Sequence, residues 1–275
     1  MGKFDDTFKR LLDPDVIKDN IEQGRINWLK EEKENKNNFS YWAPKLGSLI
    51  GPYVVFALPD WFLDAYTSGD INDKQKITDY FAENITPIIQ GMFPEGECFM
   101  KNGCFSNKFS FDQNCHIVGL SNENIVEHML NIEYDALMYE TNGDLEVVFR
   151  PYISAPENCP TMYGGMPFRV ELRAFYDFDN KKYLYDEFYW NWDYCHSKLD
   201  EVDNVVYEKE YERVYKEFEQ QRESIKKYLE ENLDKIELTG QWSVDVMVGP
   251  DGKYHVIDMA TADRSAYWNR HKFEN

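Results

Sequence analysis

The sequence predicts an α+β protein in which helices come first and mostly antiparallel sheets with inserted helices follow. Apolar residues at helical spacing dominate the first 40 residues, and strand-like segments begin near residue 96. The strongest hairpin pattern surrounds Gly249-Pro250-Asp251-Gly252 near the C-terminus. The 275 residues, 43% of them hydrophobic, can bury a sizeable core as one two-lobed domain or as two small domains.

The first part of the chain reads as helix, short strand and helix. Apolar residues at helical spacing run from Phe8 to Leu29. Prolines and glycines surround residues 53–58, which predicts a short buried strand between loops. Another helix is expected over residues 73–89, ended or kinked at Pro87.

Strands dominate from residue 96 onward. Residues 98–101 and 108–111 are expected as short strands, and a helix is expected over residues 122–139. A turn at Asn142-Gly143 precedes a strand over residues 145–153. Residues 168–178 and 182–190 form a predicted hairpin, a long amphipathic helix follows over residues 203–233, and residues 241–248 and 253–259 form the last hairpin.

The composition excludes several classes of partner. The formal net charge is −20, so phosphate backbones and anionic membrane surfaces are repelled, and no nucleic-acid or membrane partner is expected. No apolar run approaches the ~18 residues of a membrane span, and the N-terminus lacks the apolar stretch of a signal peptide. The five cysteines include no Cys-x-x-Cys pair. We therefore expect a cytoplasmic protein with reduced thiols.

The last hairpin carries two aspartates that could share a metal ion. With the turn centred on Pro250-Asp251, Asp245 and Asp258 become diagonal neighbours on the face away from the core. That register puts His255 and Ile257 on the core face. Two carboxylates on one face suit Mg²⁺, and without metal at least one is expected to have a raised pKa. The alternative is that both aspartates simply face solvent.

Cations that could hold phosphate lie on predicted strands. In residues 168–175, Arg169, Glu171 and Arg173 alternate with apolar residues, so two guanidinium groups would flank a carboxylate on one side. Arg150 ends another apolar strand. The alternative for the first set is a solvent-exposed face with a local ion pair.

A small polar loop follows the strand that ends at Lys101. Gly103 permits tight backbone, and Ser106 and Lys108 can donate hydrogen bonds to phosphate. The loop lacks the Gly-x-x-x-x-Gly-Lys-Ser/Thr spacing of a Walker A motif.

These motifs, taken in order over residues 97–260, resemble the ATP-grasp superfamily, and most closely its divergent branch around cell division cycle protein 123. The resembling segments are Lys101 to Ser106, Glu146-Val147-Val148-Phe149-Arg150, Glu171-Leu172-Arg173-Ala174-Phe175, and the pair Asp245 and Val256-Ile257-Asp258. One departure is Ala260, which stands where the branch usually has asparagine.

The resemblance implies an ATP-grasp-like two-lobed fold with a nucleotide cleft between the lobes. An N-terminal helical or mixed lobe would span residues 1–95, a small lobe 96–144 and a large lobe 145–275. The implied cofactors are ATP and Mg²⁺. Lys101 would contact the phosphates, backbone near Glu146, Val148 and Phe149 the adenine, Arg169 and Arg173 the terminal phosphate, and Asp245 and Asp258 the metal. Ser106, Lys108, Arg150 and Glu171 complete the expected ATP site.

The implied reaction is carboxylate activation by phosphoryl transfer, followed by attack of an amine, which makes the protein a carboxylate–amine ligase. The carboxylate could belong to a peptide or protein. One alternative is an ATP-binding assembly factor without ligase turnover. Another is a nucleotidyltransferase of the RNA-ligase type, with Lys101-Asn102-Gly103 as a variant of the Lys-x-Asp-Gly motif; the missing aspartate and the net negative charge argue against it.

Overall fold

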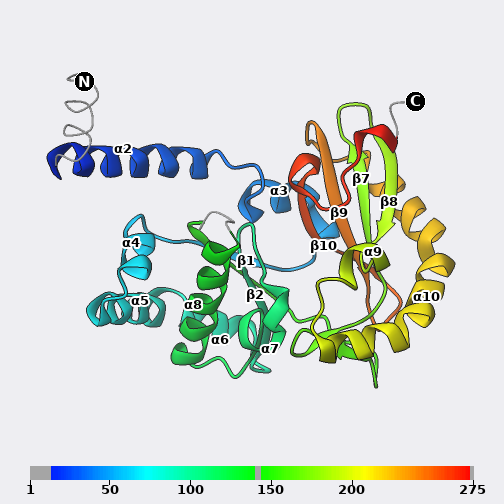
Figure 1. Cartoon of the computed structure of the whole chain (residues 1–275), viewed down its shortest axis with the longest axis horizontal. Coiled ribbons are helices and arrows are strands. Elements are labelled where there is room, and N and C mark those ends of the chain that lie inside the picture. The colour runs from blue at the N-terminus through cyan, green and yellow to red at the C-terminus, as the bar shows by residue number, and fades with distance from the viewer. Residues whose placement is uncertain (1–13, 140–143, 273–275) are drawn as a thin grey trace, which may run out of the picture. The chain divides into compact units, whose positions relative to one another are not determined.

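The computed structural model describes residues 14–139 and 144–272 (Figure 1). It divides into one unit that ends at residue 35 and a second that spans residues 36–275. The described part of the first unit is helix α2 (Pro14–Lys33), which confirms the helix expected there. The predicted apolar spacing at residues 8–12 and the turn at Asn142-Gly143 lie outside the described residues.

The second unit contains a first sheet of four antiparallel strands. These are β1 (Val54–Ala57), β2 (Glu97–Asn102), β3 (His116–Val118) and β4 (Glu146–Arg150), in the order β1-β4-β2-β3. Helices α4 (Trp61–Ser68), α5 (Ile71–Asn84), α6 (Thr86–Met92) and α8 (Asn122–Met138) contribute side chains to the core on one face of it. The α5–α6 break falls just before Pro87, as expected.

The side chains of β2 alternate between a face that is buried in the core and a face that carries Lys101. Cys98 and Met100 are fully buried in the core with α5, α6 and α8. Phe99 and Lys101 point to the opposite face because successive side chains of a strand alternate. This face of the first sheet is therefore free of α4, α5, α6 and α8, and Phe39 packs on part of it.

The predicted lobe boundaries at 95/96 and 144/145 both cut through this sheet. Its outer strand β1 comes from the segment assigned to an N-terminal lobe, and its central strand β4 from the segment assigned to the large lobe. Strand pairing thus joins the three predicted segments in one sheet, which single-segment patterns do not reveal.

A second antiparallel sheet follows in the order β10-β9-β7-β8. Its strands are β7 (Glu171–Asp177), β8 (Lys182–Phe188), β9 (Gln241–Val248) and β10 (Tyr254–Thr261), close to the expected positions. The long helix α10 (Glu201–Leu233) packs its apolar stripe on one face (Figure 1). The expected α+β architecture of mixed helix and antiparallel sheet is confirmed.

Shorter elements complete the second unit. They are α3 (Phe39–Leu46), the 3₁₀ turns η1 (Gly47–Leu49), η2 (Lys108–Ser110), η3 (Ala262–Arg264) and η4 (Arg270–Lys272), α7 (Phe111–Asn114), the β5 (Thr161–Met162)–β6 (Met166–Pro167) pair, and α9 (Trp192–Cys195). Within the described ranges, no helix combines the length and the apolar character that crossing a bilayer requires.

The strand expected at residues 108–111 is wrong, because η2 and α7 occupy this stretch. Asn107 has a φ of 43°, in the left-handed region that asparagine tolerates better than most residues. This conformation turns the chain out of the extended direction. Phe111 is buried as the first residue of α7 rather than as a strand residue.

Candidate functional site

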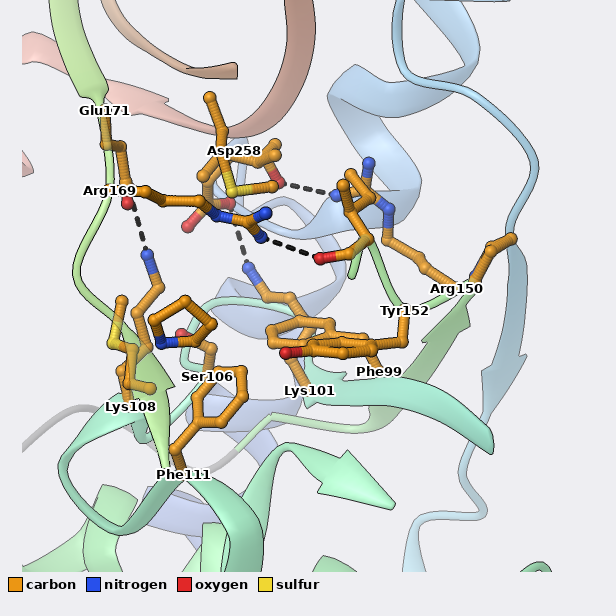
Figure 2. A pocket seen from close by; sticks show the side chains of 16 residues that line it. Phe99, Lys101, Ser106, Lys108, Phe111, Arg150, Tyr152, Arg169, Glu171 and Asp258 are labelled. Atoms are coloured by element: carbon orange, nitrogen blue, oxygen red, sulfur yellow. Dashed lines mark hydrogen bonds and ion pairs between the residues drawn. The ribbon is translucent and has the colours of Figure 1, made fainter. Parts of the chain in front are cut away.

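A cavity lies where the free face of the first sheet meets the second sheet (Figure 2). Phe99, Lys101 and Arg150 line it from the first sheet, and Glu171 and Asp258 from the second. The other sequence-predicted residues at this cavity are Ser106, Lys108 and Arg169. The fold thus brings together cations from three segments that are far apart in sequence.

Three ion pairs form a cluster at and beside this cavity. Lys101 Nζ lies 2.9 Å from Asp258 Oδ1, Lys108 Nζ lies 3.2 Å from Glu171 Oε1, and Arg173 donates two 2.7 Å hydrogen bonds to the two carboxylate oxygens of Asp245. Figure 2 shows Lys101 and Lys108 pointing towards their carboxylates. We refer to these six side chains as the ion-pair cluster. The first pair joins the two sheets, the second joins η2 to the second sheet, and the third lies within the second sheet.

The charges in the cluster are strongly coupled. Burial by itself raises the pKa of Asp258, but the positive charge and hydrogen bond of Lys101, together with the charges of Lys108 and Arg173, hold that pKa below its usual range. Burial lowers the pKa of Lys108, but Glu171 and the other acidic groups around it raise the pKa overall. The pKa of Asp258 is therefore lowered and not raised as expected. The expectation failed because the sequence pattern did not reveal the lysine partner of Asp258.

The last hairpin brings its aspartates together through a different register from the one expected. A bulge between Val256 and Asp258 inserts one extra residue, so Asp258 lies directly opposite Asp245 instead of diagonal to it. The same irregularity reverses the expected faces of the neighbours. Val256 is fully buried in the core, while Ile257 lines the cavity. His255 pairs with Met247 and is half-buried, so its core assignment is also wrong.

Arg150 and Arg169 use their guanidinium groups on backbone carbonyls. Arg150 donates to Ile257 O at 2.6 Å and to Ile50 O at 2.8 Å, and burial lowers its pKa to about 10. Arg169 donates to the carbonyls of residues 153 and 154, both at 2.7 Å. Both side chains bring positive charge to the cavity, and Arg169 is held by backbone carbonyls whereas Arg173 is held by Asp245.

The predicted adenine contact with the backbone of residues 146–149 is inconsistent with the sheet. Val148 pairs with Val55 of β1 on one side and with Lys101 of β2 on the other, and Phe149 is likewise paired on both sides. A central antiparallel strand has its N–H and C=O groups engaged by its two neighbours. The segment after β4 has no strand partner, and its Tyr152 and Ile153 line the cavity.

Glu146 also lies away from the cavity, in a tight contact that explains Gly103. The backbone N–H of Ser40 donates to Glu146 Oε1 at 3.1 Å, and the Glu146 residue is only 6% exposed. A Cβ atom on Gly103 would lie 2.4 Å from that oxygen. The glycine is required by this close approach to a buried carboxylate.

We expect Gly103→Ala to lower the free energy of unfolding by about 1–3 kcal/mol, because the added methyl group overpacks against buried Glu146. Urea denaturation at an unchanged m value measures the effect. Gly91→Ala is the matched control: it lies in α6 with open space around its Cβ position and should be neutral or slightly stabilising. An equal effect of the two changes would contradict the close-contact explanation.

A second cavity adjoins the first on the side of Arg173. It shares Ser106, Lys108, Met166 and Asp258 with the first cavity, and seven of its sixteen lining residues are aromatic. The tyrosines and tryptophan in this wall are Tyr163, Tyr189, Trp190, Tyr194 and Tyr267. Sequence reasoning missed all of them, because single aromatic residues in separate segments look like ordinary core. We call this space the aromatic cavity.

The carboxylates of the cluster fit Mg²⁺ in number and kind. Mg²⁺ is usually held by one or two protein carboxylates together with water and substrate phosphates. Asp245 and Asp258 face each other across β9 and β10, and both are paired with cations that phosphate could attract away. Among the described residues no cluster of three or more acidic, histidine or cysteine side chains is arranged to hold a metal without such help.

The comparisons with known proteins give a likeness of fold. No family profile matches the sequence, and no curated protein sequence matches it. C-terminally truncated Cdc123 from Schizosaccharomyces pombe matches with a TM-score of 0.50 and 12% identity, over 84% of this chain and 85% of that chain. D-alanine–D-alanine ligase from Bacillus anthracis, complexed with ATP, matches with a TM-score of 0.36 and 13% identity, over 82% of this chain and 53% of that chain. D-cycloserine synthetase DcsG matches with a TM-score of 0.33 and 14% identity, over 81% of this chain and 61% of that chain. The expected resemblance to the Cdc123 branch is confirmed for the fold.

Proposed function

We propose that this protein is an ATP- and magnesium-dependent ligase that activates a carboxylate as an acyl phosphate. The observation that carries the proposal is the charge inventory of the cavity and the ion-pair cluster. Five cationic side chains meet three carboxylates there: Lys101, Lys108, Arg150, Arg169 and Arg173 against Glu171, Asp245 and Asp258. The excess of two positive charges matches the roughly two negative charges of a magnesium–ATP complex.

Binding of Mg-ATP can proceed as an exchange of partners within the cluster. Asp245 and Asp258 would hold Mg²⁺, while Lys101 and Arg173 would pair with the phosphate oxygens. Each buried side-chain charge then exchanges one oppositely charged partner for another and is not left unpaired. This matters because an uncompensated buried charge is strongly destabilising.

The adenine belongs at the apolar end of the first cavity. The wall there is formed by Tyr152, Ile153, Met247 and Ile257, none of which lines the aromatic cavity. An apolar cavity with a few polar groups at one end is typical of nucleotide and cofactor sites. The chain segment after β4 offers backbone groups outside any strand, so it replaces residues 146–149 as the adenine-binding segment.

The reaction uses the shared wall of the two cavities. A substrate carboxylate oxygen attacks the terminal phosphorus, the bond to ADP breaks, and an acyl phosphate forms. An amine then attacks the acyl carbon, phosphate leaves, and the amine loses a proton. Lys108 and Arg173 neutralise the negative charge at the phosphoryl group, so catalysis is positioning and charge stabilisation. Mg²⁺ supplies further neutralisation when bound.

Binding of Mg-ATP is the first test of the proposal. A ligand that binds only the folded state stabilises it by about 2.7 kcal/mol at a hundredfold excess over its dissociation constant. We expect a clear rise of the unfolding temperature with Mg-ATP, a smaller one with ATP and a chelator, and none with Mg²⁺ alone. No shift with Mg-ATP would exclude the proposed site.

A second candidate, an ATP-binding assembly factor, is favoured by Ala260, which removes the metal-binding asparagine expected from the resemblance. Release of ADP in the presence of carboxylate and amine substrates separates the two functions, because the assembly factor binds Mg-ATP without that turnover. A covalent AMP on Lys101, measured as a mass increase of the intact protein, would instead establish the nucleotidyltransferase alternative.

A further inference from the structure

The aromatic cavity has the size and the wall of a site for a flat side chain. Its volume is about 260 Å³, larger than the ~150 Å³ that accepts a benzene ring in an engineered cavity. Its rings hold one another in place: Tyr194 meets Tyr267 edge-on at 4.9 Å, and Tyr189 meets Trp190 at 5.3 Å. Edge-to-face contacts of this kind are also available to an added aromatic ring.

Arg173 supplies an anion-binding group to the same cavity. Its Nε and Nη2 atoms donate to Asp245, whereas its Nη1 atom makes no hydrogen bond to any residue that the structure describes. The guanidinium carbon lies 5.0 Å from the ring centre of Tyr189 and 6.0 Å from that of Tyr267. A carboxylate that enters between these rings can accept a hydrogen bond from Nη1.

Asn107 supplies an unused acceptor. Its residue is 1% exposed and lines the aromatic cavity, and its Nδ2 donates to a carboxylate oxygen of Asp135. A carboxylate accepts only, so this bond fixes the amide orientation and directs Oδ1 elsewhere. Oδ1 has no hydrogen-bond partner in residues 14–139 and 144–272. A buried acceptor without a partner is costly, so a ligand N–H that reaches it would bind favourably.

A surface groove continues the aromatic cavity outward. Phe109 and Tyr163 line both spaces, and Tyr139, Lys198 and Val202 line the outer one. Phe109 is 48% exposed and Tyr139 is 55% exposed, so large apolar side chains face solvent along this path. The groove has room for a chain that extends away from the cavity.

We propose that the aromatic cavity binds the carboxyl-terminal residue of a peptide, and that this residue is aromatic. Its carboxylate lies at Arg173, its backbone N–H donates to Asn107, and its ring lies among the tyrosines. The preceding residues of the peptide follow the outer groove. The further step, that this carboxylate is the one phosphorylated, rests on the proposed function; the binding itself does not.

Calorimetric titration of the whole protein with four small probes tests the three contacts. The reference probe is N-acetyl-L-phenylalanine. N-acetyl-L-alanine lacks the ring, 3-phenylpropanoate lacks the N–H, and N-acetyl-L-phenylalanine amide lacks the carboxylate. We expect each of these three to bind about tenfold or more weakly than the reference, since each loses one contact in a buried site. Equal affinity of all four probes would overturn the proposal.

A comparison of a tripeptide with a free amino acid tests whether the bound carboxylate belongs to a peptide. Ala-Ala-Phe should bind more tightly than free phenylalanine, because only the peptide reaches the outer groove and presents an amide N–H. Tighter binding of free phenylalanine would replace the peptide by an amino acid and contradict the assignment of the groove.

A pair of variants isolates Asn107. Asn107→Gly keeps the left-handed backbone (φ 43°) accessible and removes Oδ1. It should weaken N-acetyl-L-phenylalanine about tenfold and leave 3-phenylpropanoate unchanged, which also shows that the cavity remains folded. Asp135→Ala is the matched control, because it removes the partner of Nδ2 but retains Oδ1. If Asn107→Gly weakens the binding of both probes equally, Asn107 acts only structurally. The same conclusion follows if Asn107→Gly and Asp135→Ala weaken the binding of N-acetyl-L-phenylalanine equally.

The two proposals can fail separately. Probe binding without any Mg-ATP binding would refute the ligase and leave the peptide site. Mg-ATP binding without discrimination among the probes, with or without nucleotide, would refute the peptide site alone. If Asn107→Gly does not fold, the four-probe comparison on the unmodified protein still decides.

Discussion

Replacement of Arg173 by methionine is expected to lower the free energy of unfolding by about 3–5 kcal/mol, because it leaves Asp245 charged and buried without its partner. The Asp245 residue is 2% exposed and has both carboxylate oxygens bonded to Arg173. The same change should reduce carboxylate-dependent ADP release at least ~100-fold, since Arg173 faces the transferred phosphoryl group in the proposed reaction. Urea denaturation and an ADP-release assay measure the two effects.

The double variant Arg173→Met with Asp245→Leu separates stability from function. An apolar pair of similar volume often replaces a buried ion pair without loss of stability, so the unfolding free energy should recover while ADP release does not. Arg222→Met is the matched control, because its 2.6 Å pair with Asp186 joins α10 to β8 away from both cavities. Loss of ADP release in that control, or activity in the double variant, would contradict the assigned role.

Replacement of Asp258 by asparagine is expected to remove the magnesium dependence of ATP binding. The variant retains an oxygen near Lys101 but loses the negative charge that Mg²⁺ requires. Mg-ATP should bind at least tenfold more weakly, whereas ATP with a chelator should not be weakened, because one carboxylate no longer repels the phosphates. Titration of a fluorescent ATP analogue at fixed Mg²⁺ and at fixed chelator measures both affinities.

The structure adds a stability effect to this variant. Lys101 is 2% exposed and the Asp258 side chain is 30% exposed, so loss of the charge should cost about 1–3 kcal/mol of unfolding free energy rather than nothing. Asp251→Asn in the turn of the same hairpin is the control, since its pair with Lys253 is exposed. Unchanged Mg-ATP binding in Asp258→Asn would exclude Asp258 as a magnesium ligand.

Much of the fold could be predicted because its strands and helices carry clear periodicities. The short apolar run of β2, the alternation of β7 and the apolar stripe of α10 are local signals, and each of these elements appears close to where its pattern places it. The candidate site could also be predicted in part from the sequence. Lys101, Glu171 and Asp258 converge because a charged residue on an otherwise apolar strand needs a partner when it is buried, and Lys108 joins them from η2.

The misplaced features depend on long-range pairing. No local signal reveals the bulge before Asp258, which sets Asp245 and Asp258 directly opposite each other. The partner of Lys101 is 157 positions away, so its ion pair could not be read from spacing. Asn107 and the tyrosines of the aromatic cavity come from separate segments. One signal was available for Asn107: it follows a glycine-containing loop, where asparagine often adopts left-handed backbone.

The place of β4 in the first sheet bears on how the protein folds during synthesis. Residue Val54 of β1 pairs with Phe149 of β4, and β4 separates β1 from β2. The inner strand β4 is therefore the last strand of this sheet to leave the ribosome, and until then β1 and β2 have unpaired edges. Closing so long a loop is slow, and exposed edges invite aggregation. The same segment continues directly into the wall of the first cavity, whose remaining residues, up to Asp258, come later in the chain, so the sheet can be complete before the cavity is.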